Sequence, residues 1–580
     1  MISPFLGVFD PGGLPCFKFL QGSEVYRSGD VIAAFSGFLA NETELRRDHP
    51  DAPAGAAGLI SHLHHHEKNW MNLIWGEYVA AIYDGRDKGL TLIRDRIGFY
   101  PLFVVRQREK TYFATSIHLL LSLPEIPRAP CHETLARFIG THYRHVEGNR
   151  RTTAFAGVEQ LPGGTLLRVT ADGFHEESYW DERNIVEQSP YKDEQEAADS
   201  LRSLLADAVR RRSAGRMTQA GFALSSGMDS SSILALAASA ENARPPIFTT
   251  SFAGWKDDEA IEAKETAAHF GTWNPIIIDT IPDFLEAATE LQSVHDEPVV
   301  TVTWLWDYMM QKEVSRRGCR LFFGGLGGDE LFAGEFEHFF FHFADLDEAG
   351  EQEALRHEIE EWVKLHDHPV HRKSRDLVEK IWSRMRDPGG RVRTDPERHG
   401  RYIPALSMEM RKAAGSAPVL DNPWVSYLKN RLWQDLRAET TLPCLRAATL
   451  NAGAHGMEIR FPFLDHRVVE LAMPLPGPWK IRDGITKRVL RRAMRGVLPD
   501  NVLNRARKMG WASPADQMFR GAALDKLEAH LHSSEWMTKS LYDANVLARI
   551  AAEHRAGQAD HSMFLWQFAA VEAWWRRWFG

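Results

Sequence analysis

The chain has 580 residues, too many for one hydrophobic core, so two or more domains are expected. Its formal net charge of −9 argues against a nucleic-acid-binding protein, which usually shows a basic surface. Four widely spaced cysteines without a CxxC pair, no visible signal peptide and no long uncharged apolar run predict a cytoplasmic protein without a disulfide framework or membrane span.

The first third of the chain is rich in predicted strands. Short apolar runs at 31–35, 78–83 and 90–93 are separated by Gly, Asp and Pro turns, and a turn at 161–164 leads into a further strand. The polar stretch 182–194 then marks a domain boundary. We therefore expect a first domain over residues 1–185 and a second over 190–580.

The second domain begins with a predicted helix at 195–212, which carries apolar residues at helical spacing. Four elements then alternate: a strand at 220–224, a helix from Ser230, a strand at 247–252 and a helix at 259–270. This alternation predicts a parallel sheet. Residues 346–440 are charged and interrupted by Pro-Gly, which indicates a helical insertion. The Trp-rich end, 569–579, predicts a terminal helix that docks on the body.

The strongest chemical signal is the segment Leu224-Ser-Ser-Gly-Met-Asp-Ser-Ser-Ser232 between a strand and a helix. In such a turn backbone N–H groups and the positive helix end can bind phosphate. Asp229 would repel a bare phosphate, so its presence suggests a bridging magnesium ion. An ordinary Ser-rich helix cap is the alternative.

This segment resembles the SGGxDS loop of the PP-loop ATP pyrophosphatases, with Ser226 in place of the first Gly. Those enzymes cleave ATP between its α- and β-phosphates and form an acyl-adenylate. The resemblance implies ATP and Mg²⁺ as cofactors, with Asp229 as one metal ligand. The implied ATP-binding residues are Leu224, Ser225, Ser226, Gly227, Asp229, Ser230, Ser231, Thr250, Phe252, Gly325 and Lys508.

Further stretches resemble the asparagine synthetase family. Residues 324–334, Gly-Gly-Leu-Gly-Gly-Asp-Glu-Leu-Phe-Ala-Gly, match its second Gly-rich loop, which makes Asp329 the other metal ligand. Residues 487–491 match a family helix. Lys508, in Arg-Ala-Arg-Lys, matches the catalytic lysine that would neutralise the α-phosphate. The segment 445–465 carries Glu458, Arg460 and Asp465 at family positions, where direct catalysis and buried ionic support both stay open.

The first domain resembles the family's glutaminase domain through Arg94-Asp-Arg-Ile-Gly-Phe-Tyr-Pro-Leu-Phe103. Working glutaminases of this class use a terminal cysteine whose own amino group serves as the base. Here Ser3 stands at that position, and Phe38 replaces the glutamate that would hold the amino group of glutamine. We therefore expect an inactive glutaminase domain. The implied fold is an Ntn-hydrolase-like α+β sandwich followed by a PP-loop parallel-sheet synthetase domain (adenine nucleotide α-hydrolase-like).

The acid and the amine that the enzyme joins are less well defined. Leu326 stands where asparagine synthetases have a glutamate and β-lactam synthetases a catalytic tyrosine, so no general base is identified. Lasso peptide cyclases, family members with inactive glutaminase domains, share the Gly-x-Gly-Gly-Asp pattern. We therefore expect a macrolactam synthetase whose partners are a precursor peptide, or a small carboxylate, and a processing protease. The alternative is amidation of aspartate or another small acid with ammonia.

Two other classes of function are disfavoured by the sequence. An RNA-modifying PP-loop enzyme is disfavoured because a basic patch and a cysteine pair are missing from the sequence. A scaffold without activity is disfavoured because Asp229, Asp329 and Lys508 are all present. The aromatic segment 335–343 is expected either to line an acceptor pocket or to form a buried helix.

Overall fold

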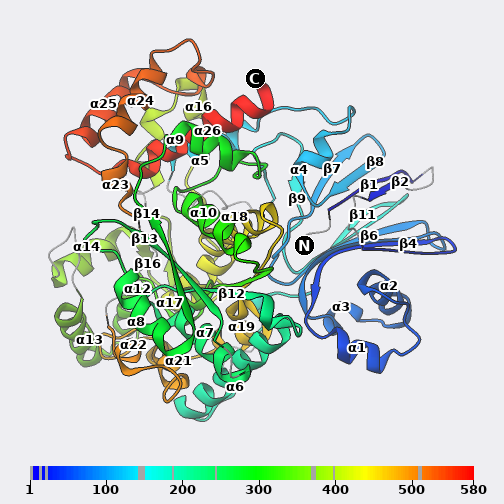
Figure 1. The fold of residues 1–580 in the computed structure, drawn as a ribbon, viewed down its shortest axis with the longest axis horizontal. Coiled ribbons are helices and arrows are strands. Elements are labelled where there is room, and N and C mark those ends of the chain that lie inside the picture. Colours follow the sequence, from blue (N-terminus) through cyan, green and yellow to red (C-terminus); the bar gives the residue numbers. More distant parts are fainter. Residues whose placement is uncertain are drawn as a thin grey trace.

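A computed structural model shows two domains in contact, the first at the right of Figure 1 and the second at the left. It describes residues 4–11, 16–19, 24–141, 151–185, 189–241, 244–366, 374–395, 399–506 and 513–580. Within this part of the chain, no helix is both long and apolar enough to cross a membrane.

The N-terminal domain contains two antiparallel sheets. One has the strand order β2 (Cys16–Phe19), β1 (Phe5–Phe9), β8 (Lys110–Ala114), β7 (Phe103–Gln107) and β9 (Glu159–Gln160). The other has the order β11 (Gly173–Ser178), β10 (Thr165–Thr170), β6 (Gly89–Arg94), β5 (Gly76–Asp84), β4 (Val31–Leu39) and β3 (Glu24–Ser28). Phe5, Phe113, Val79 and Leu92 from both sheets belong to one buried core. The expected sandwich is therefore confirmed, with α2 (Ala56–His66) packed on the outer side of the second sheet.

The second domain contains the predicted parallel sheet, with the order β14 (Thr272–Ile278), β13 (Pro246–Phe252), β12 (Ala220–Ala223), β15 (Leu321–Phe323) and β18 (Glu458–Arg460). Helices α7 (Met228–Glu241) and α8 (Ala260–Phe270) alternate with the first strands, as the sequence predicts. The chain moves outward from β12 to β14 and then returns to the other side of β12 with β15. In open α/β sheets, ligands bind where the strand order reverses in this way.

The segment between β15 and β18 is mostly helical, and its parts pack in two places. Helices α12 (His338–Glu348), α13 (Gln352–Leu365), α14 (Arg375–Met385) and α17 (Tyr427–Gln434) share a core of their own around Trp362. Helix α16 (Met408–Ala414) packs instead against α5 (His132–Gly140) of the first domain. The Trp-rich end forms α26 (Ser562–Phe579), which docks as expected: the indole N–H of Trp566 donates to the Val299 carbonyl at 2.8 Å.

Buried ion pairs connect the two domains. The Arg212 guanidinium lies 2.7 Å from Glu77 of β5 and 2.7 Å from Asp465, and all three side chains are almost fully buried. Arg460 pairs with both Glu77 and Glu458. The arginines hold the pKa of the Asp465 carboxyl far below its usual range, although burial alone would raise it. Of the two roles left open for Glu458, Arg460 and Asp465, this arrangement favours ionic support, because none of the three lines the cavity described below.

Candidate active site

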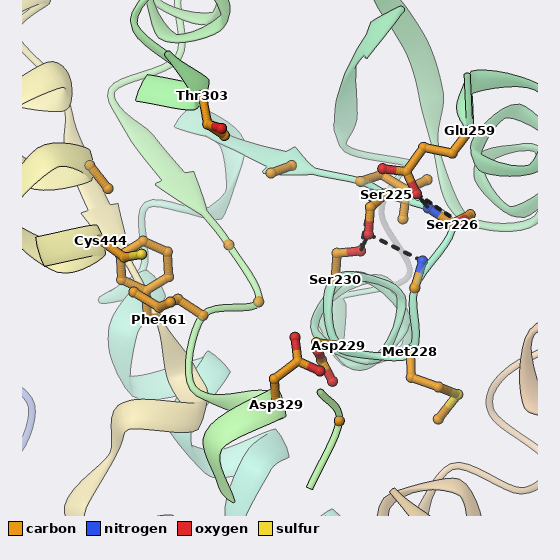
Figure 2. Close-up of a pocket in the computed structure, with 18 of the residues that line it drawn as sticks. Ser225, Ser226, Met228, Asp229, Ser230, Glu259, Thr303, Asp329, Cys444 and Phe461 are labelled. Carbon is orange, nitrogen blue, oxygen red and sulfur yellow. Dashed lines mark hydrogen bonds between the residues drawn. The ribbon is translucent and has the colours of Figure 1, made fainter. Parts of the chain in front are cut away.

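A cavity of about 550 Å³ opens at the carboxyl ends of β12 and β15, the point where the strand order reverses. Its walls include the loop after β12, the loop after β15, the start of α10 (Thr303–Arg316) and part of α18 (Thr441–Ala454). Figure 2 shows Ser225, Ser226 and Ser230 on one side of this space, with Cys444 and Phe461 across from them. The cavity is large enough for a nucleotide and part of a second substrate.

The loop after β12 has the geometry expected of a phosphate loop. It ends where α7 begins at Met228, so the first-turn N–H groups of that helix have no acceptor within the helix. The Ser230 hydroxyl accepts a hydrogen bond from the Ser225 N–H at 3.1 Å, and the Gly227 N–H donates to the Ser225 hydroxyl at 3.1 Å. These bonds fix the loop and leave the helix end facing the cavity (Figure 2).

The two aspartates predicted as metal ligands lie together at the floor of the cavity. The Lys487 ammonium is 2.5 Å from Asp229 Oδ2 and 2.7 Å from Asp329 Oδ1. The loop carrying Asp329 can approach so closely because it contains glycines. A Cβ on Gly328 would lie 2.4 Å from the Asp229 carboxyl carbon, and Gly327 has a φ of +101°, which other residues rarely adopt.

A divalent cation fits this donor set. Two carboxylate oxygens, one from the first turn of α7 and one from α11 (Gly328–Phe332), lie within 2.7 Å of one ammonium nitrogen, so they converge on a single positive charge. Hard oxygen ligands of this kind suit Mg²⁺, which is normally bound by one or two carboxylates together with substrate phosphates. Asp229 and Asp329 would therefore hold Mg²⁺, and the first turn of α7 would hold the phosphates.

The Ser226 peptide unit is held between an acid and a base. Its N–H and its hydroxyl both donate to Glu259 Oε2, at 3.0 and 2.8 Å, and its carbonyl accepts from the Arg505 guanidinium at 2.6 Å. Burial raises the pKa of Glu259 to about 7, although the two bonds from Ser226 lower it. The serine that replaces the family's glycine thus adds a second hydrogen bond to this acid.

Replacing Glu259 with Gln should change how stability depends on pH. Because the pKa of Glu259 is raised in the folded protein from its ordinary 4.5 to about 7, its contribution to stability is complete below about pH 4.5 and is lost as pH rises through 7. The difference corresponds to about 3 kcal/mol of the free energy of unfolding. Between pH 4.5 and 8, the free energy of unfolding of Glu259→Gln, measured by thermal unfolding, should therefore fall less than that of wild type. The exposed Glu265→Gln on the same helix is the control, and parallel curves for wild type and Glu259→Gln would contradict the assignment.

Most of the residues expected to bind ATP line the cavity. They are Leu224, Ser225, Ser226, Gly227, Asp229, Ser230, Thr250 and Gly325, together with Asp329. Two others do not line it: the Ser231 hydroxyl donates to the Gly227 carbonyl at 2.8 Å, and Phe252 packs against Trp255 and Trp306. Lys508 and Ser3 lie outside the described residues.

Three basic residues in the cavity wall had no role assigned from the sequence: Lys487, Arg491 and Arg505. Lys487 and Arg491 belong to the 487–491 stretch that resembles a family helix. Arg491 lies in α21 (Arg488–Ala493) and Lys487 directly precedes this helix, so their spacing of four residues brings both side chains to the same side. Burial lowers the pKa of Arg491 to about 10, and its side chain is held by the Thr486 and Leu503 carbonyls. Positive charge therefore faces the phosphate loop.

Apolar side chains form another part of the cavity wall. Leu326 is half-buried and lines the cavity, at the position where the family has an acid or a tyrosine. Cys444 and Phe461 line the cavity as well. Of the aromatic segment 335–343, Glu335 lines the cavity, whereas its phenylalanines are buried around Trp362. The expected buried helix is therefore confirmed for the phenylalanines, and an acceptor pocket at Glu335 stays a prediction.

Comparisons with known proteins agree with the geometry. The family model described as asparagine synthase matches residues 200–576, and a glutamine amidotransferase domain model matches residues 25–180. A putative glutamine-hydrolysing asparagine synthetase of Mycobacterium bovis is 26% identical, covering 94% of this chain and 84% of its own. Asparagine synthetase 3 of Bacillus subtilis is 24% identical, covering 83% and 75%. The chain therefore belongs to the asparagine synthase family, whose members are ATP- and Mg²⁺-dependent, AMP-forming carbon–nitrogen ligases.

Proposed function

We propose that this protein activates a carboxylate as its adenylate, releases pyrophosphate and allows an amine to attack the activated carbonyl. The observation that carries the proposal is the convergence of Asp229 and Asp329 beside a phosphate loop in one cavity. Bound Mg²⁺ would draw electrons from the β- and γ-phosphates and so make pyrophosphate a better leaving group. The first turn of α7 would bind the phosphates, and Asp229 and Asp329 would hold the Mg²⁺.

Positive side chains balance the charge of the reacting phosphates. Lys487, Arg491 and Arg505 line the cavity around the phosphate loop. The resemblance adds Lys508 at the α-phosphate, where charge develops as the amine attacks and AMP leaves. That assignment stays a prediction: Lys508→Ala should lower product formation by roughly a hundredfold, with less effect on binding.

The attacking amine is proposed to come from outside the N-terminal domain. Phe38 stands where a glutaminase would hold the amino group of glutamine, and the Arg460 guanidinium lies 4.7 Å from the centre of its ring. A cation in contact with an aromatic ring leaves no carboxylate at this position to bind an ammonium group. This contact and the ion pairs of Glu77 with Arg212 and Arg460 favour a structural role for the N-terminal domain, which packs against the second domain.

Purified protein should therefore release no glutamate from glutamine above the rate of a protein-free blank, whether or not ATP is present. Ser3→Ala should leave that background unchanged, because a serine that is not the terminal residue lacks the adjacent amine base. A coupled glutamate dehydrogenase assay measures the release. Glutamine hydrolysis that disappears in Ser3→Ala would show that the domain is a working glutaminase and would restore glutamine as the nitrogen source.

Two amide-forming reactions fit the site. Formation of a peptide macrolactam, as in lasso peptide cyclases, is supported by Phe38 and by Leu326, which cannot exchange a proton with the substrate. Amidation of aspartate with ammonia is supported by the names of the relatives, which are asparagine synthetases. We favour the macrolactam because the apolar wall at Leu326, Cys444 and Phe461 suits a peptide better than a small dianion.

One screen separates these reactions. Pyrophosphate release from ATP would be measured with free aspartate plus ammonia, with other small acids, and with peptides bearing an N-terminal amine and an internal Asp or Glu. Release with peptides, together with a product lighter by one water, supports the macrolactam. Release with aspartate and formation of asparagine would replace it with amidation.

A further inference from the structure

Asp307 is a carboxylate in the cavity wall that neither the phosphate loop nor the metal site uses. It lies on α10, one turn after Thr303, and only 3% of its surface is exposed. Thr303 lies across the cavity from the phosphate loop in Figure 2, on the same side as Cys444. Asp307 thus belongs to the α10 wall, which begins at Thr303 across the cavity from the phosphate loop.

Both hydrogen bonds that described side chains donate to the Asp307 carboxylate end on the same oxygen, Oδ2. Gln311 Nε2 donates to Oδ2 at 2.6 Å, and Asn451 Nδ2 donates to the same oxygen at 2.7 Å. The Asn451 amide is itself fixed, because its Oδ1 lies 2.9 Å from His295 Nε2. Among the described residues, no hydrogen bond is donated to Oδ1. Since Asp307 lines the cavity, Oδ1 is the oxygen that a ligand can reach.

No described cation pairs with this carboxylate. Trp304 and Met310 of the same helix also line the cavity. The contacts of the basic residues lie elsewhere: Arg505 donates to the Ser226 carbonyl, and Lys487 pairs with Asp229 and Asp329. Burial raises the pKa of Asp307 to about 7, and the two amides lower it only in part. A buried acid without a positive partner is costly, and a cationic ligand would remove that cost.

We propose that Asp307 binds a protonated primary amine carried by the substrate at the end of the cavity opposite the phosphate loop. This inference rests on the proposed function, because it takes the molecule that carries the amine to be one of the two reactants: the activated acid or the attacking amine. Both the N-terminus of a peptide and the α-amine of an amino acid have this chemistry. The surrounding apolar wall would hold the adjoining carbon chain, and Oδ1 would accept a charge-assisted hydrogen bond.

The test uses n-butylammonium as probe and n-butanol as its neutral counterpart, with the full-length protein at pH 8. Saturation-transfer NMR measures binding without turnover. Wild type should bind n-butylammonium at least tenfold more tightly than n-butanol. Asp307→Asn, which keeps the shape of the side chain, should bind n-butylammonium at least tenfold more weakly. Asp345→Asn, a change at a buried acid outside the cavity, should leave binding unchanged.

Equal binding of n-butylammonium by wild type and Asp307→Asn would overturn the proposal. Equal binding of the two probes by wild type would overturn it as well, and that comparison needs no variant. Binding of ATP, measured by calorimetry, should be the same in Asp307→Asn and wild type. Pyrophosphate release without amine binding would refute the amine site alone, whereas amine binding without any pyrophosphate release would refute the adenylation chemistry alone.

Discussion

Asp229→Ala and Asp329→Ala should each reduce pyrophosphate release by roughly a thousandfold or more while leaving the fold intact. Losing one of two carboxylates removes several kcal/mol of charge stabilisation at the phosphates, and each 1.4 kcal/mol is a factor of ten in rate. The fold should persist, because Lys487 keeps one carboxylate partner in either variant. A coupled pyrophosphate assay over a range of Mg²⁺ concentrations measures the effect.

The control is Glu265→Ala, which removes an exposed acid from α8, away from the cavity wall. It should release pyrophosphate at the wild-type rate. Circular dichroism and thermal unfolding would establish that all three variants are folded. Normal pyrophosphate release in either aspartate variant would rule out joint metal binding by Asp229 and Asp329.

Lys487→Met should lower pyrophosphate release by roughly a hundredfold, the usual cost of removing one preorganised charge from an active site. It should also destabilise the metal-free protein, because Asp229 and Asp329 would both lose the ammonium that lies between them. Removing one partner of a buried ion pair typically costs about 3–5 kcal/mol; here the carboxylates are partly exposed, so the loss should be smaller.

Millimolar Mg²⁺ should restore the thermal stability of Lys487→Met, because a divalent cation supplies the missing charge between the carboxylates. Wild type should gain much less from Mg²⁺, since its carboxylates already share the ammonium. Lys412→Met, a change at an exposed lysine of α16, is the control. If Mg²⁺ stabilised wild type and Lys487→Met equally, the carboxylate pair would not be the metal site.

Local patterns in the sequence determined the architecture. Short apolar runs with turns between them predicted β4, β5, β6 and β10, and alternating strands and helices predicted the parallel sheet. The phosphate loop was also visible, because a turn of small residues between a strand and a helix is a local feature. Asp329 could be assigned because its own loop resembles a family motif.

Only the tertiary structure decided which distant residues meet. Lys487 reaches Asp229 across more than 250 positions, and the Ser226 carbonyl reaches Arg505 in the same way. The burial of Asp307, which has no cationic partner among the described residues, depends on the packing of α10 against α18, and no local pattern encodes that packing. The net charge around a cavity depends on which charged side chains folding brings together from distant elements. The sequence specifies each element but not which of these side chains meet.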